Sequence, residues 1–541
     1  MTSLIETDVL IIGAGPSGLM AANELQRRNI DFVCLEKSPE RSDLSKALGI
    51  QARALELFEL MDLHKPFLER GYPGPGAKLY LGEGKPSTID LYHIKSRYPY
   101  MLVLPQNETE EILEKHLNAM GGTIDREHEV VEVMQSENGV FVKAKHNGEW
   151  KSYMCKYLLA CDGSKSGVRQ ALNVEFVGED EGYTFFLGDV EIPDMSEIYI
   201  DMHLNDRGAA AFFPYKDGSY RVVGWDRTQQ GQPFRDAPSL QELQESLDRI
   251  LEEKSYRVGN PKWLSFFGTA HRQVENYRKG RVFFVGDAAH IHNPLGGQGM
   301  NLGLEDASNL GWKLEAVLKG YAKDSFLDSY HDERSPVATS VLRVTSKEMR
   351  MIDLKGAQGR LRNAAGRTVL TQDWVQQLIA NHLAHIPKDY DKTSKNKALK
   401  DSSASRKAIQ AGERVPDQML FYDGSTDERL YPFIERYGHV CLIYIDCQDD
   451  ELIEFAYSFT KKAEAEYPGL LKVFLVAKGG TVDTNGEDLP IIYDVHRHLD
   501  KSLGMKKGST LLIRPDGHAA FHDTSADPDQ TMEKLRQFFH S

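Results

Sequence analysis

The chain has 541 residues, of which 41% are hydrophobic and 27% charged, so its composition is that of a globular protein with two or three domains. Its formal net charge is −15 and no stripe rich in lysine or arginine stands out, which argues against nucleic acid and anionic membranes as partners. No apolar run approaches the ~20 residues that span a bilayer. The five cysteines form no secreted framework, and we therefore expect a reduced, cytoplasmic protein.

Residues 8–36 predict a βαβ unit rather than a signal peptide. Acidic residues precede the apolar stretch, where a signal peptide carries basic ones, and glycines interrupt it. The pattern predicts a strand over 8–12, a glycine turn over 13–18, a helix over 19–28 and a parallel strand over 31–35. Such a unit favours a doubly wound parallel sheet.

The rest of the chain divides into further predicted parts of an α/β protein. Residues 183–225 are rich in strands and aromatic side chains, which predicts an antiparallel sheet inserted into the first domain. Residues 389–408 are polar and predict an exposed linker. After it, strand, helix, strand, hairpin and helix follow in a thioredoxin-like order. The predicted domains are a Rossmann-like domain with its following helices (1–180 and 270–390), a substrate-binding sheet (181–269), a linker (391–420) and a thioredoxin-like domain (421–541).

The turn within the βαβ unit carries a dinucleotide-binding fingerprint. Gly13 permits a tight turn, Gly15 lets a pyrophosphate approach the backbone, and Gly18 allows the helix to pack closely on the strand. The helix N-terminus offers free N–H groups and the positive end of its dipole to the phosphates. Glu36 ends the second strand, where a carboxylate accepts hydrogen bonds from ribose hydroxyls. The pattern predicts a bound dinucleotide but does not distinguish FAD from NAD.

A second glycine-rich loop, GDAAHIHNPLGGQGMN at 286–301, distinguishes the two. It follows the apolar run 282–285, and Asp287 therefore caps a predicted parallel strand, where a carboxylate suits the hydroxyls of a ribityl chain. The loop leads into a helix that starts near Leu302. A helix N-terminus aimed at a flavin ring would stabilise the negative charge of its reduced form. Because an NAD site needs no such loop, the sequence favours FAD.

The two histidines of this loop have different expected roles. His290 is predicted to pack or to hydrogen-bond behind the site. His292 lies nearer the expected flavin ring, and both a substrate-pocket role and a scaffold role stay open for it. We predict no metal site, because His-x-His has no nearby cysteine or carboxylate ligand except Asp287, which is expected to bind the flavin.

Four motifs, in this order, resemble those of the single-component FAD-dependent aromatic hydroxylases, the para-hydroxybenzoate hydroxylase-like flavin monooxygenases. They are GAGPSG with Glu36, Leu104-Pro105-Gln106, CDGSKSGVR at 161–169 and GDAAHIHNPLGGQGMN at 286–301. The resemblance covers residues 5–345.

This resemblance implies a set of cofactor-binding residues. They are Gly13, Gly15, Pro16, Ser17, Gly18, Glu36, Lys37, Arg53, Gln106, Asp162, Gly286, Asp287, Pro294, Gly297, Gln298, Gly299, Met300 and Asn301. The glycine turn with its following carboxylate would hold the ADP half of FAD, and Arg53 and Gln106 would contact the phosphate and ribityl region. Asp162 is associated in the family with both FAD and transient NADPH binding, and Asp287 with the ribityl hydroxyls. Residues 294–301 would line the flavin ring.

The C-terminal part resembles the long members of this group, which include phenol, pentachlorophenol and polyketide hydroxylases and rifampicin monooxygenases. The resemblance rests on GERVPD at 412–417 and RPDG at 514–517. A redox role would need a Cys-x-x-Cys pair, which is absent. Cys441 and Cys447 on one predicted strand would lie ~20 Å apart at ~3.3 Å per residue, too far for a disulfide. We expect this domain to be structural or an interaction surface.

The substrate side departs from the phenol hydroxylases. Their corresponding stretch carries an aspartate that helps to deprotonate the phenol, whereas Leu48 and its neighbours include no carboxylate. The stretch SKALGIQARALELFE is more similar to the rifampicin and polyketide types. Candidate substrate residues are Leu48, Phe212, Phe213 and Trp225, and candidate catalytic pocket residues are His292 and Pro294. The aromatic residues have core packing as their alternative role.

The resemblance implies a reaction in two halves. NAD(P)H reduces FAD, and the reduced flavin combines with O₂ to give a C4a-hydroperoxide, which transfers one oxygen atom to an aromatic or polyketide-like ring. Two alternatives stay open. In the first, the same flavin chemistry gives Baeyer–Villiger insertion, epoxidation or antibiotic inactivation. In the second, the chain is a flavin-binding scaffold with a C-terminal interaction module. The choice between NADPH and NADH, and that between monomer and homodimer, also stay open.

Overall fold

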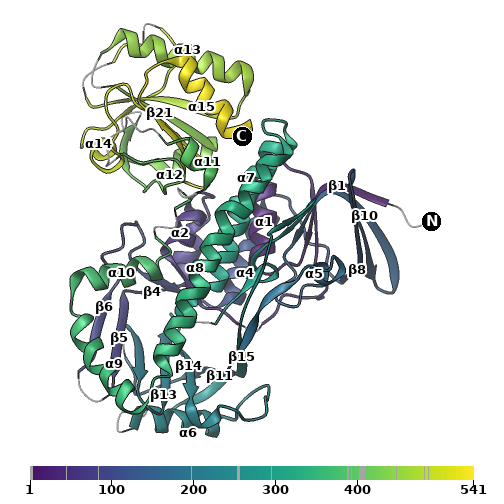
Figure 1. Cartoon of the computed structure of the whole chain (residues 1–541), viewed down its shortest axis with the longest axis vertical. Coiled ribbons are helices and arrows are strands. Elements are labelled where there is room, and N and C mark those ends of the chain that lie inside the picture. Colours follow the sequence, from purple (N-terminus) through teal and green to yellow (C-terminus); the bar gives the residue numbers. More distant parts are fainter. Residues whose placement is uncertain are drawn as a thin grey trace. The chain divides into compact units, whose positions relative to one another are not determined.

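The computed structural model divides the chain into two compact units (Figure 1). The described residues are 4–43, 45–82, 85–196, 198–252, 256–293, 295–386, 389–390, 393–400, 408–422, 425–445, 448–479, 482–484 and 486–540. The first unit comprises Met1–Leu55, Lys65–Ser308 and Arg334–Ile386, and the second comprises Glu56–His64, Asn309–Glu333 and Pro387–Ser541.

The first unit contains a sheet whose central strands are parallel. Its order is β16-β17-β10-β1-β2, and the hairpin β8–β9 pairs with β10. The strands are β1 (Leu4–Ile12), β2 (Phe32–Leu35), β8 (His128–Ser136), β9 (Gly139–His146), β10 (Glu149–Ala160), β16 (Arg278–Lys279) and β17 (Val282–Phe284). Strand β1 is parallel to both β2 and β10, and Val9, Leu10 and Ile11 are fully buried. Helix α1 (Pro16–Gln26) joins β1 to β2, which confirms the predicted βαβ unit.

A second sheet of the first unit is mostly antiparallel, as predicted for the inserted region. Its order is β18-β15-β11-β14-β13-β12-β5-β6. The strands are β5 (Gly76–Leu81), β6 (Ser87–Asp90), β11 (Phe176–Glu191), β12 (Ile200–Leu204), β13 (Gly208–Pro214), β14 (Tyr220–Asp226), β15 (Gly259–Val274) and β18 (His290–Ile291). One face packs on the amphipathic helix α6 (Leu240–Leu251) through Leu243, Leu247 and Ile250. The sheet also recruits β5, β6 and β18 from outside the predicted insertion, because strand pairing does not follow chain order.

A small sheet and several helices complete the first unit. The small sheet has the order β3 (Gly49–Ile50), β7 (Met101–Val103) and β4 (Tyr72–Gly74). The helices are α2 (Ala52–Glu59), α3 (His64–Arg70), α4 (Gln106–Ala119), α5 (Gly167–Ala171), α7 (Gly299–Leu318), α8 (Ser329–Ile352), α9 (Gly356–Val369) and α10 (Asp373–Leu383). The division between the units falls inside α2, α3, α7 and α8, so continuous helices belong to both.

The second unit is built on a mixed sheet with the order β20-β19-β23-β22-β21-β24-β25. Its strands are β19 (Met419–Tyr422), β20 (Ser425–Arg429), β21 (His439–Ile445), β22 (Leu471–Ala477), β23 (Ile491–Tyr493), β24 (Thr510–Ile513) and β25 (Ala519–Asp523). Its helices are α11 (Ser394–Ala398), α12 (Leu430–Tyr437), α13 (Asp450–Glu466), α14 (His498–Leu503) and α15 (Pro528–His540). The strands and helices predicted beyond residue 438 are present in the predicted order. Strand β23 and helix α14, which lie between β22 and β24, were not predicted. Cys441 is a buried thiol, and Cys447 lies outside the described residues.

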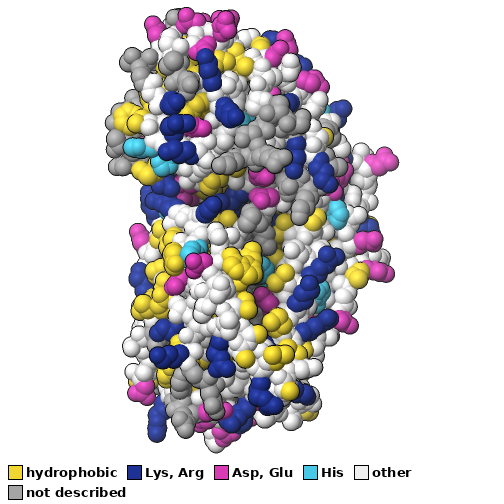
Figure 2. All heavy atoms as spheres, turned by 60° about the vertical axis from the view of Figure 1, so that its left-hand side comes forward, with side chains coloured by type: hydrophobic (Ala, Val, Ile, Leu, Met, Phe, Trp, Pro, Cys, Tyr) yellow, Lys and Arg dark blue, Asp and Glu magenta, His cyan; other side chains and the backbone are white. Residues whose placement is uncertain are grey.

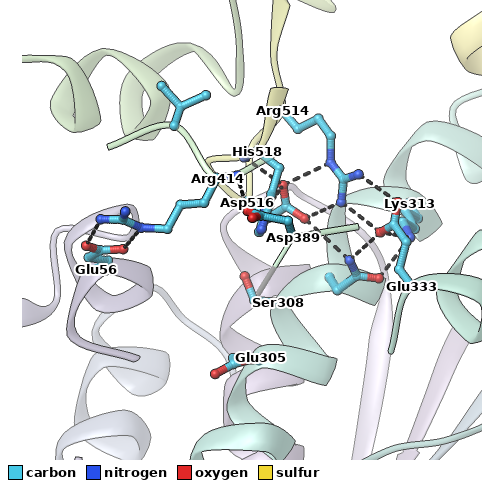
Figure 3. Close-up of polar contacts among 12 residues, drawn as sticks. Glu56, Glu305, Ser308, Lys313, Glu333, Asp389, Arg414, Arg514, Asp516 and His518 are labelled. Atoms are coloured by element: carbon cyan, nitrogen blue, oxygen red, sulfur yellow. Dashed lines mark hydrogen bonds and ion pairs between the residues drawn. The ribbon is translucent and has the colours of Figure 1, made fainter. Parts of the chain in front are cut away.

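A buried charged cluster joins the RPDG turn to α7 and α8 within the second unit (Figure 3). Arg514 donates to both oxygens of Glu333, over 2.7 and 2.9 Å, and its Nε donates to Asp516 Oδ1 over 3.0 Å. Lys313 Nζ donates to Glu333 Oε2 and to Asn309 Oδ1, each over 2.8 Å. The RPDG motif is therefore a structural element, since each of its charged side chains has protein partners.

The predicted linker is only partly exposed. In its described part Tyr390, Asn396 and Leu399 are buried, and the Tyr390 ring packs against His518 at a tilt of 31° with centroids 4.4 Å apart. The prediction of an exposed segment from its polar composition was wrong for these residues, because isolated apolar and amide side chains anchor it to the core.

Charged and apolar side chains are mixed on one face of the molecule (Figure 2). On the face shown in Figure 2, lysine and arginine side chains are interspersed with acidic and apolar ones. Within the described part of the chain, no helix is both long enough and apolar enough to cross a membrane.

Candidate active site

The glycine turn between β1 and α1 has the geometry that a pyrophosphate site needs. Gly13 has φ +99°, and a Cβ there would lie 2.5 Å from the carbonyl oxygen of Cys161. A Cβ on Gly18 would lie 1.9 Å from the carbonyl oxygen of Gly13, so neither position accepts a side chain. At Gly15, by contrast, a Cβ would meet nothing within 4 Å. The turn is thus tightly packed on the protein side and open where a phosphate would approach the N-terminus of α1.

Glu36 is held beside this turn. Its Oε2 accepts a hydrogen bond from the backbone N–H of Ala14 over 2.8 Å, and its Oε1 accepts one from Ser38 over 2.9 Å. Each carboxylate oxygen keeps a further lone pair, which suits ribose hydroxyls. The next side chain, Lys37, is exposed.

The two glycine-rich loops meet at Ser17. Gly286 has φ +60°, and a Cβ there would lie 2.3 Å from Ser17 Oγ. A Cβ on Gly303 in α7 would lie 2.2 Å from the same oxygen. Ser17 therefore occupies a notch between the end of β17 and α7, and the absence of side chains at both glycines allows this approach. Gly303 was not singled out in the sequence.

Two carboxylates lie at the ends of the parallel strands. Asp287 is exposed, yet the protein around it desolvates its carboxylate and raises its pKa, which is the behaviour of a group in a concave surface. Burial likewise raises the pKa of Asp162, whose Oδ2 accepts a hydrogen bond from the N–H of Val168. Asp162 Oδ1 is buried without a hydrogen-bond partner among the described residues. These oxygens are available to the hydroxyl groups of a cofactor.

Arg169 joins the two loops that carry these carboxylates. Its Nη1 donates to the carbonyl oxygen of Ala288 over 3.0 Å, and its Nη2 donates to that of Ser164 over 2.6 Å. The arginine of the CDGSKSGVR motif therefore fixes the position of one loop against the other.

His290 lies behind the site, as predicted. Its Nε2 lies 2.8 Å from Asp306 Oδ2, and Asp306 Oδ1 accepts a hydrogen bond from Arg334 Nε over 2.7 Å. Asp306 Oδ2 also accepts the backbone N–H of Gly286 over 3.2 Å. His290 is fully enclosed. Sequence reasoning missed Asp306 and Arg334, since nothing in their local sequence distinguishes them from ordinary helical surface residues.

His292 is a neutral imidazole in this structure. Its Nδ1 lies 2.6 Å from the carbonyl oxygen of Asn293, and burial lowers its pKa to about 4. Its Nε2 is buried without a hydrogen-bond partner among the described residues. A Cβ atom placed on Gly299 would lie 3.5 Å from this nitrogen. It therefore faces the start of α7 with one free nitrogen. Pro294, its predicted companion, lies outside the described residues.

Asn301 ties the second glycine-rich loop to the segment that contains Leu48. Its Nδ2 donates to the carbonyl oxygens of Gly49 and Gly297, each over 2.8 Å, and its Oδ1 accepts the N–H of Gln51 over 2.9 Å. Gln51 Nε2 in turn donates to Gly296 O over 3.0 Å. Both polar atoms of the Asn301 amide have protein partners, in three hydrogen bonds, so this residue positions the loop.

Gly297 and Gln298 lie in the tight part of the same loop. Gly297 has φ +62°, a conformation that favours glycine, and the preceding Gly296 has φ +76°. The Gln298 amide lies 3.0 Å from His382 through its Nε2, while its Oε1 is buried without a partner among the described residues. Met300 is half-buried at the start of α7.

Gln106 and Arg221 hold the segment before Leu48. Gln106 Oε1 accepts the N–H of Ala47 over 3.1 Å, and its backbone N–H donates to Ser45 Oγ over 2.8 Å. Arg221, which is fully buried, donates to the carbonyl oxygen of Ser45 over 2.6 Å and pairs with both oxygens of Asp189. Gln106 thus positions the backbone of this segment, and nothing in the local sequence indicates the buried pair of Arg221 and Asp189.

Arg53 is buried at the start of α2, where its backbone N–H donates to the carbonyl oxygen of Ala384 over 3.2 Å. The structure therefore places Arg53 next to the end of α10, a neighbour that the sequence did not suggest.

The four candidate substrate residues separate into different environments. Leu48 packs with Val103, Tyr215 and Phe213. The neighbouring Phe212 points to the opposite face of the sheet, where it is buried against α6. Trp225 packs with Phe185 and Met349 in a separate cluster. Only Leu48 and Phe213 therefore share one apolar surface, and the core-packing alternative holds for Phe212.

The polar groups around the two glycine-rich loops fit FAD. The first loop is an open turn at a helix N-terminus with a carboxylate beside it. Two further carboxylates lie at strand ends, and a second helix N-terminus starts at Gly299. Together with the inserted antiparallel sheet, these features fit the fold and site of a flavoprotein. A family model described as "FAD binding domain" matches residues 6–345, more than half of the chain, and the chain belongs to this family.

Relatives agree over most of the length. YhjG of Bacillus subtilis, described as an uncharacterized aromatic compound monooxygenase, is 32% identical over 530 residues, which cover 97% of this chain and 96% of the relative. Rifampicin monooxygenase of Streptomyces venezuelae is 36% identical over 395 residues, which cover 71% of this chain and 79% of that enzyme. The solved structure of OxyS anhydrotetracycline hydroxylase from Streptomyces rimosus is 30% identical, covers 99% of both chains and has a TM-score of 0.76.

The chain is thus an FAD-dependent monooxygenase of the aromatic hydroxylase type, with reduced nicotinamide as the co-substrate typical of the family. The scaffold alternative and the other oxygen-insertion outcomes are not favoured by these relatives.

Proposed function

We propose that this enzyme uses NAD(P)H and O₂ to hydroxylate a large phenolic substrate of the polyketide or fused-ring type. The observation that carries the proposal is the hydrophobic cluster of Leu48, Val103 and Tyr215, against which the partly buried Phe213 packs. It lies next to the second glycine-rich loop, because Asn301 of that loop donates to the carbonyl oxygen of Gly49. Apolar side chains at this place, without a carboxylate at residues 47–49, suit a multi-ring substrate better than a simple phenol. The relatives named for rifampicin and anhydrotetracycline support this substrate class.

The proposed cofactor residues act in three groups. The turn from Gly13 to Gly18 and Glu36 would hold the ADP half, and Asp162 and Asp287 would bind the middle of FAD through its hydroxyl groups. The start of α7 would face the flavin ring with backbone N–H groups. Bound FAD would supply hydride acceptance and oxygen activation.

The chain's remaining task is to orient the substrate and exclude water. Leu48 and Phe213 would lie against the substrate. His292, neutral around pH 7, would offer an uncharged ring in the pocket, because a charged one would attract water to a site that must stay dry.

A substrate screen tests this proposal. Purified enzyme is assayed for stimulated NAD(P)H oxidation with hydroxyanthraquinones, tetracycline-type and rifamycin-type compounds and simple phenols, and products are analysed by mass spectrometry. We expect multi-ring phenols to gain one oxygen atom. Stimulated oxidation that yields H₂O₂ alone would identify a pseudo-substrate, and preference for simple phenols would contradict the substrate class.

The domain boundaries, assembly and location belong to the same proposal. We infer a FAD-binding domain over 1–180 and 270–390, a substrate-binding sheet over 181–269 and a thioredoxin-like domain over 421–541 without a redox pair. We further propose a cytoplasmic enzyme that forms homodimers. Sedimentation analysis of the full-length protein tests the assembly, and a monomer at micromolar concentration would contradict it.

A further inference from the structure

Helices α8 and α10 bring a carboxylate and an imidazole to the second glycine-rich loop. His382 Nε2, near the end of α10, lies 3.0 Å from Gln298 Nε2 and 3.9 Å from Glu348 Oε1 of α8. The next residue of α10, Leu383, has its Cδ2 3.6 Å from where a Cβ on Gly296 would be. Neither Glu348 nor His382 belongs to a sequence motif described above.

The carboxyl group of Glu348 is partly exposed to solvent and is also desolvated by the surrounding protein. Its side chain is 40% exposed and that of His382 is 25% exposed. Burial nevertheless raises the pKa of Glu348 to about 7. A carboxylate that is both accessible and desolvated lies in a concave part of a surface, where perturbed acids are often functional. The adjacent Met349 packs on Phe185 and Trp225, which places this turn of α8 against the antiparallel sheet.

The reaction needs a base that the segment around Leu48 does not supply. A phenolate ring is more electron-rich than a phenol ring and transfers electron density to an attacking oxygen more readily. Residues 47–49 are Ala, Leu and Gly. His292 has its Nδ1 against the carbonyl oxygen of Asn293, and its low pKa of about 4 makes it a weak base.

We propose that Glu348, partnered by His382, is the base that accepts the proton of the substrate's phenolic hydroxyl group. This inference rests on the proposed function. In the step the O–H bond of the substrate breaks, its electron pair stays on oxygen, and the proton moves to the Glu348 carboxylate. No electron is transferred and no co-reactant is needed. Because the Glu348 side chain is partly exposed, the proton then passes to solvent.

The electrostatic setting of Glu348 is simple. In the described part of the chain, the ionisable partner of Glu348 is His382 on α10, and the loop presents the neutral amide of Gln298 to His382. A base of this kind works when ionised, so kcat/KM of the wild type should rise with pH through the pKa of Glu348, about 7, and then level off.

Glu348→Gln tests the role, with Glu454→Gln on the exposed face of α13 as the matched control. Full-length enzymes with bound FAD are compared for the best phenolic substrate of the screen and for its nitro-substituted analogue, which is already ionised at the assay pH. We expect kcat/KM for the phenol to fall about 10²-fold in Glu348→Gln and the rising limb to disappear. The ionised analogue should be turned over nearly as fast as by the wild type.

Further variants separate catalysis from folding. Glu348→Asp should recover part of the activity, and the rise of kcat/KM with pH should occur at a different pH. His382→Gln should shift the pH at which kcat/KM rises but should not abolish the rise. Dissociation constants from fluorescence quenching should change little for the methyl ether of the phenol, which has no proton to lose. An unchanged pH limb in Glu348→Gln, or an equal loss with the ionised analogue, would overturn the assignment. If the wild type turns over no phenol at all, the proposed function itself fails.

Discussion

Two polar clusters of this molecule differ in how their buried atoms are paired. In the charged cluster of the second unit, Arg514, Lys313, Glu333 and Asp516 satisfy one another. Around the glycine-rich loops of the first unit, Asp162 Oδ1, His292 Nε2 and Gln298 Oε1 are buried without partners among the described residues. A buried polar atom without a partner costs free energy. We therefore interpret the charged cluster as part of the fold, and the three unpaired atoms beside the glycine-rich loops as groups that a bound cofactor or substrate would hydrogen-bond.

The strongest test of this difference is Arg514→Ala. The change leaves Glu333 and Asp516 buried with fewer partners, and we expect a loss of about 3–5 kcal/mol in the free energy of unfolding. Urea denaturation measures the change. Arg536→Ala, at an exposed pair with Glu466, is the control and should alter stability little. A small effect of Arg514→Ala would mean that water replaces the lost partners.

The acid dependence of this cluster has a definite sign. The Arg514 guanidinium holds the pKa of both Glu333 and Asp516 below the ordinary value of these carboxyls. A depressed pKa contributes stability above the unfolded-state pKa, and that contribution is lost as the pH falls through the folded-state pKa. We expect Glu333→Gln to lose more stability at pH 7 than at about pH 3, because acid removes the wild-type advantage. Denaturation at both pH values measures it, and an equal loss at both would contradict the ionic origin.

Asn301→Ala tests a paired residue within the active-site region. It removes three hydrogen bonds to buried backbone groups of Gly49, Gln51 and Gly297. We expect a loss of about 1–3 kcal/mol in unfolding free energy even without FAD, because the residue positions the loop. Thermal unfolding of the apoprotein measures this. Unchanged apoprotein stability with weakened FAD binding would instead assign Asn301 to the cofactor.

Gly15→Ala should affect the cofactor and spare the fold. A Cβ at Gly15 meets no protein atom within 4 Å, and the residue has φ −74°, which alanine adopts freely. We expect FAD to bind at least about tenfold more weakly, which corresponds to about 1.4 kcal/mol, since the methyl group occupies the phosphate approach. Equilibrium dialysis measures the affinity. Gly18→Ala is the contrasting variant, because its Cβ would clash with Gly13 O and destabilise the apoprotein itself.

The smallest expected stability effect belongs to Asp162→Asn. Burial raises the pKa of this carboxyl, so its ionised form is disfavoured in the folded apoprotein. We expect the neutral amide to leave apoprotein stability unchanged or slightly higher, while FAD binding weakens. Denaturation with and without FAD separates the two effects. A clear loss of apoprotein stability would show that Asp162 is a structural residue like those of the charged cluster.

The sequence determined the features that depend on local chemistry. The spacing of glycines after an apolar run predicted the turn at Gly13–Gly18 and the βαβ unit, because few residues other than glycine tolerate these backbone angles and approaches. The motif order predicted the family, and the packing role of His290 was foreseen. The order of elements in the C-terminal part also followed from alternating apolar runs and turn residues.

Tertiary structure decided which of these residues face one another. Phe212 and Phe213 are adjacent in sequence, yet only the pairing of β13 shows that one packs on α6 and the other beside Leu48. Asn301 was predicted at the flavin ring, but its amide binds backbone groups from a segment about 250 residues earlier. Glu348 and His382 carry no local signal, because a carboxylate acquires an unusual pKa only when folding surrounds it with protein. The local sequence determined the local conformation. The pairing and desolvation of side chains arose from contacts between distant parts of the chain.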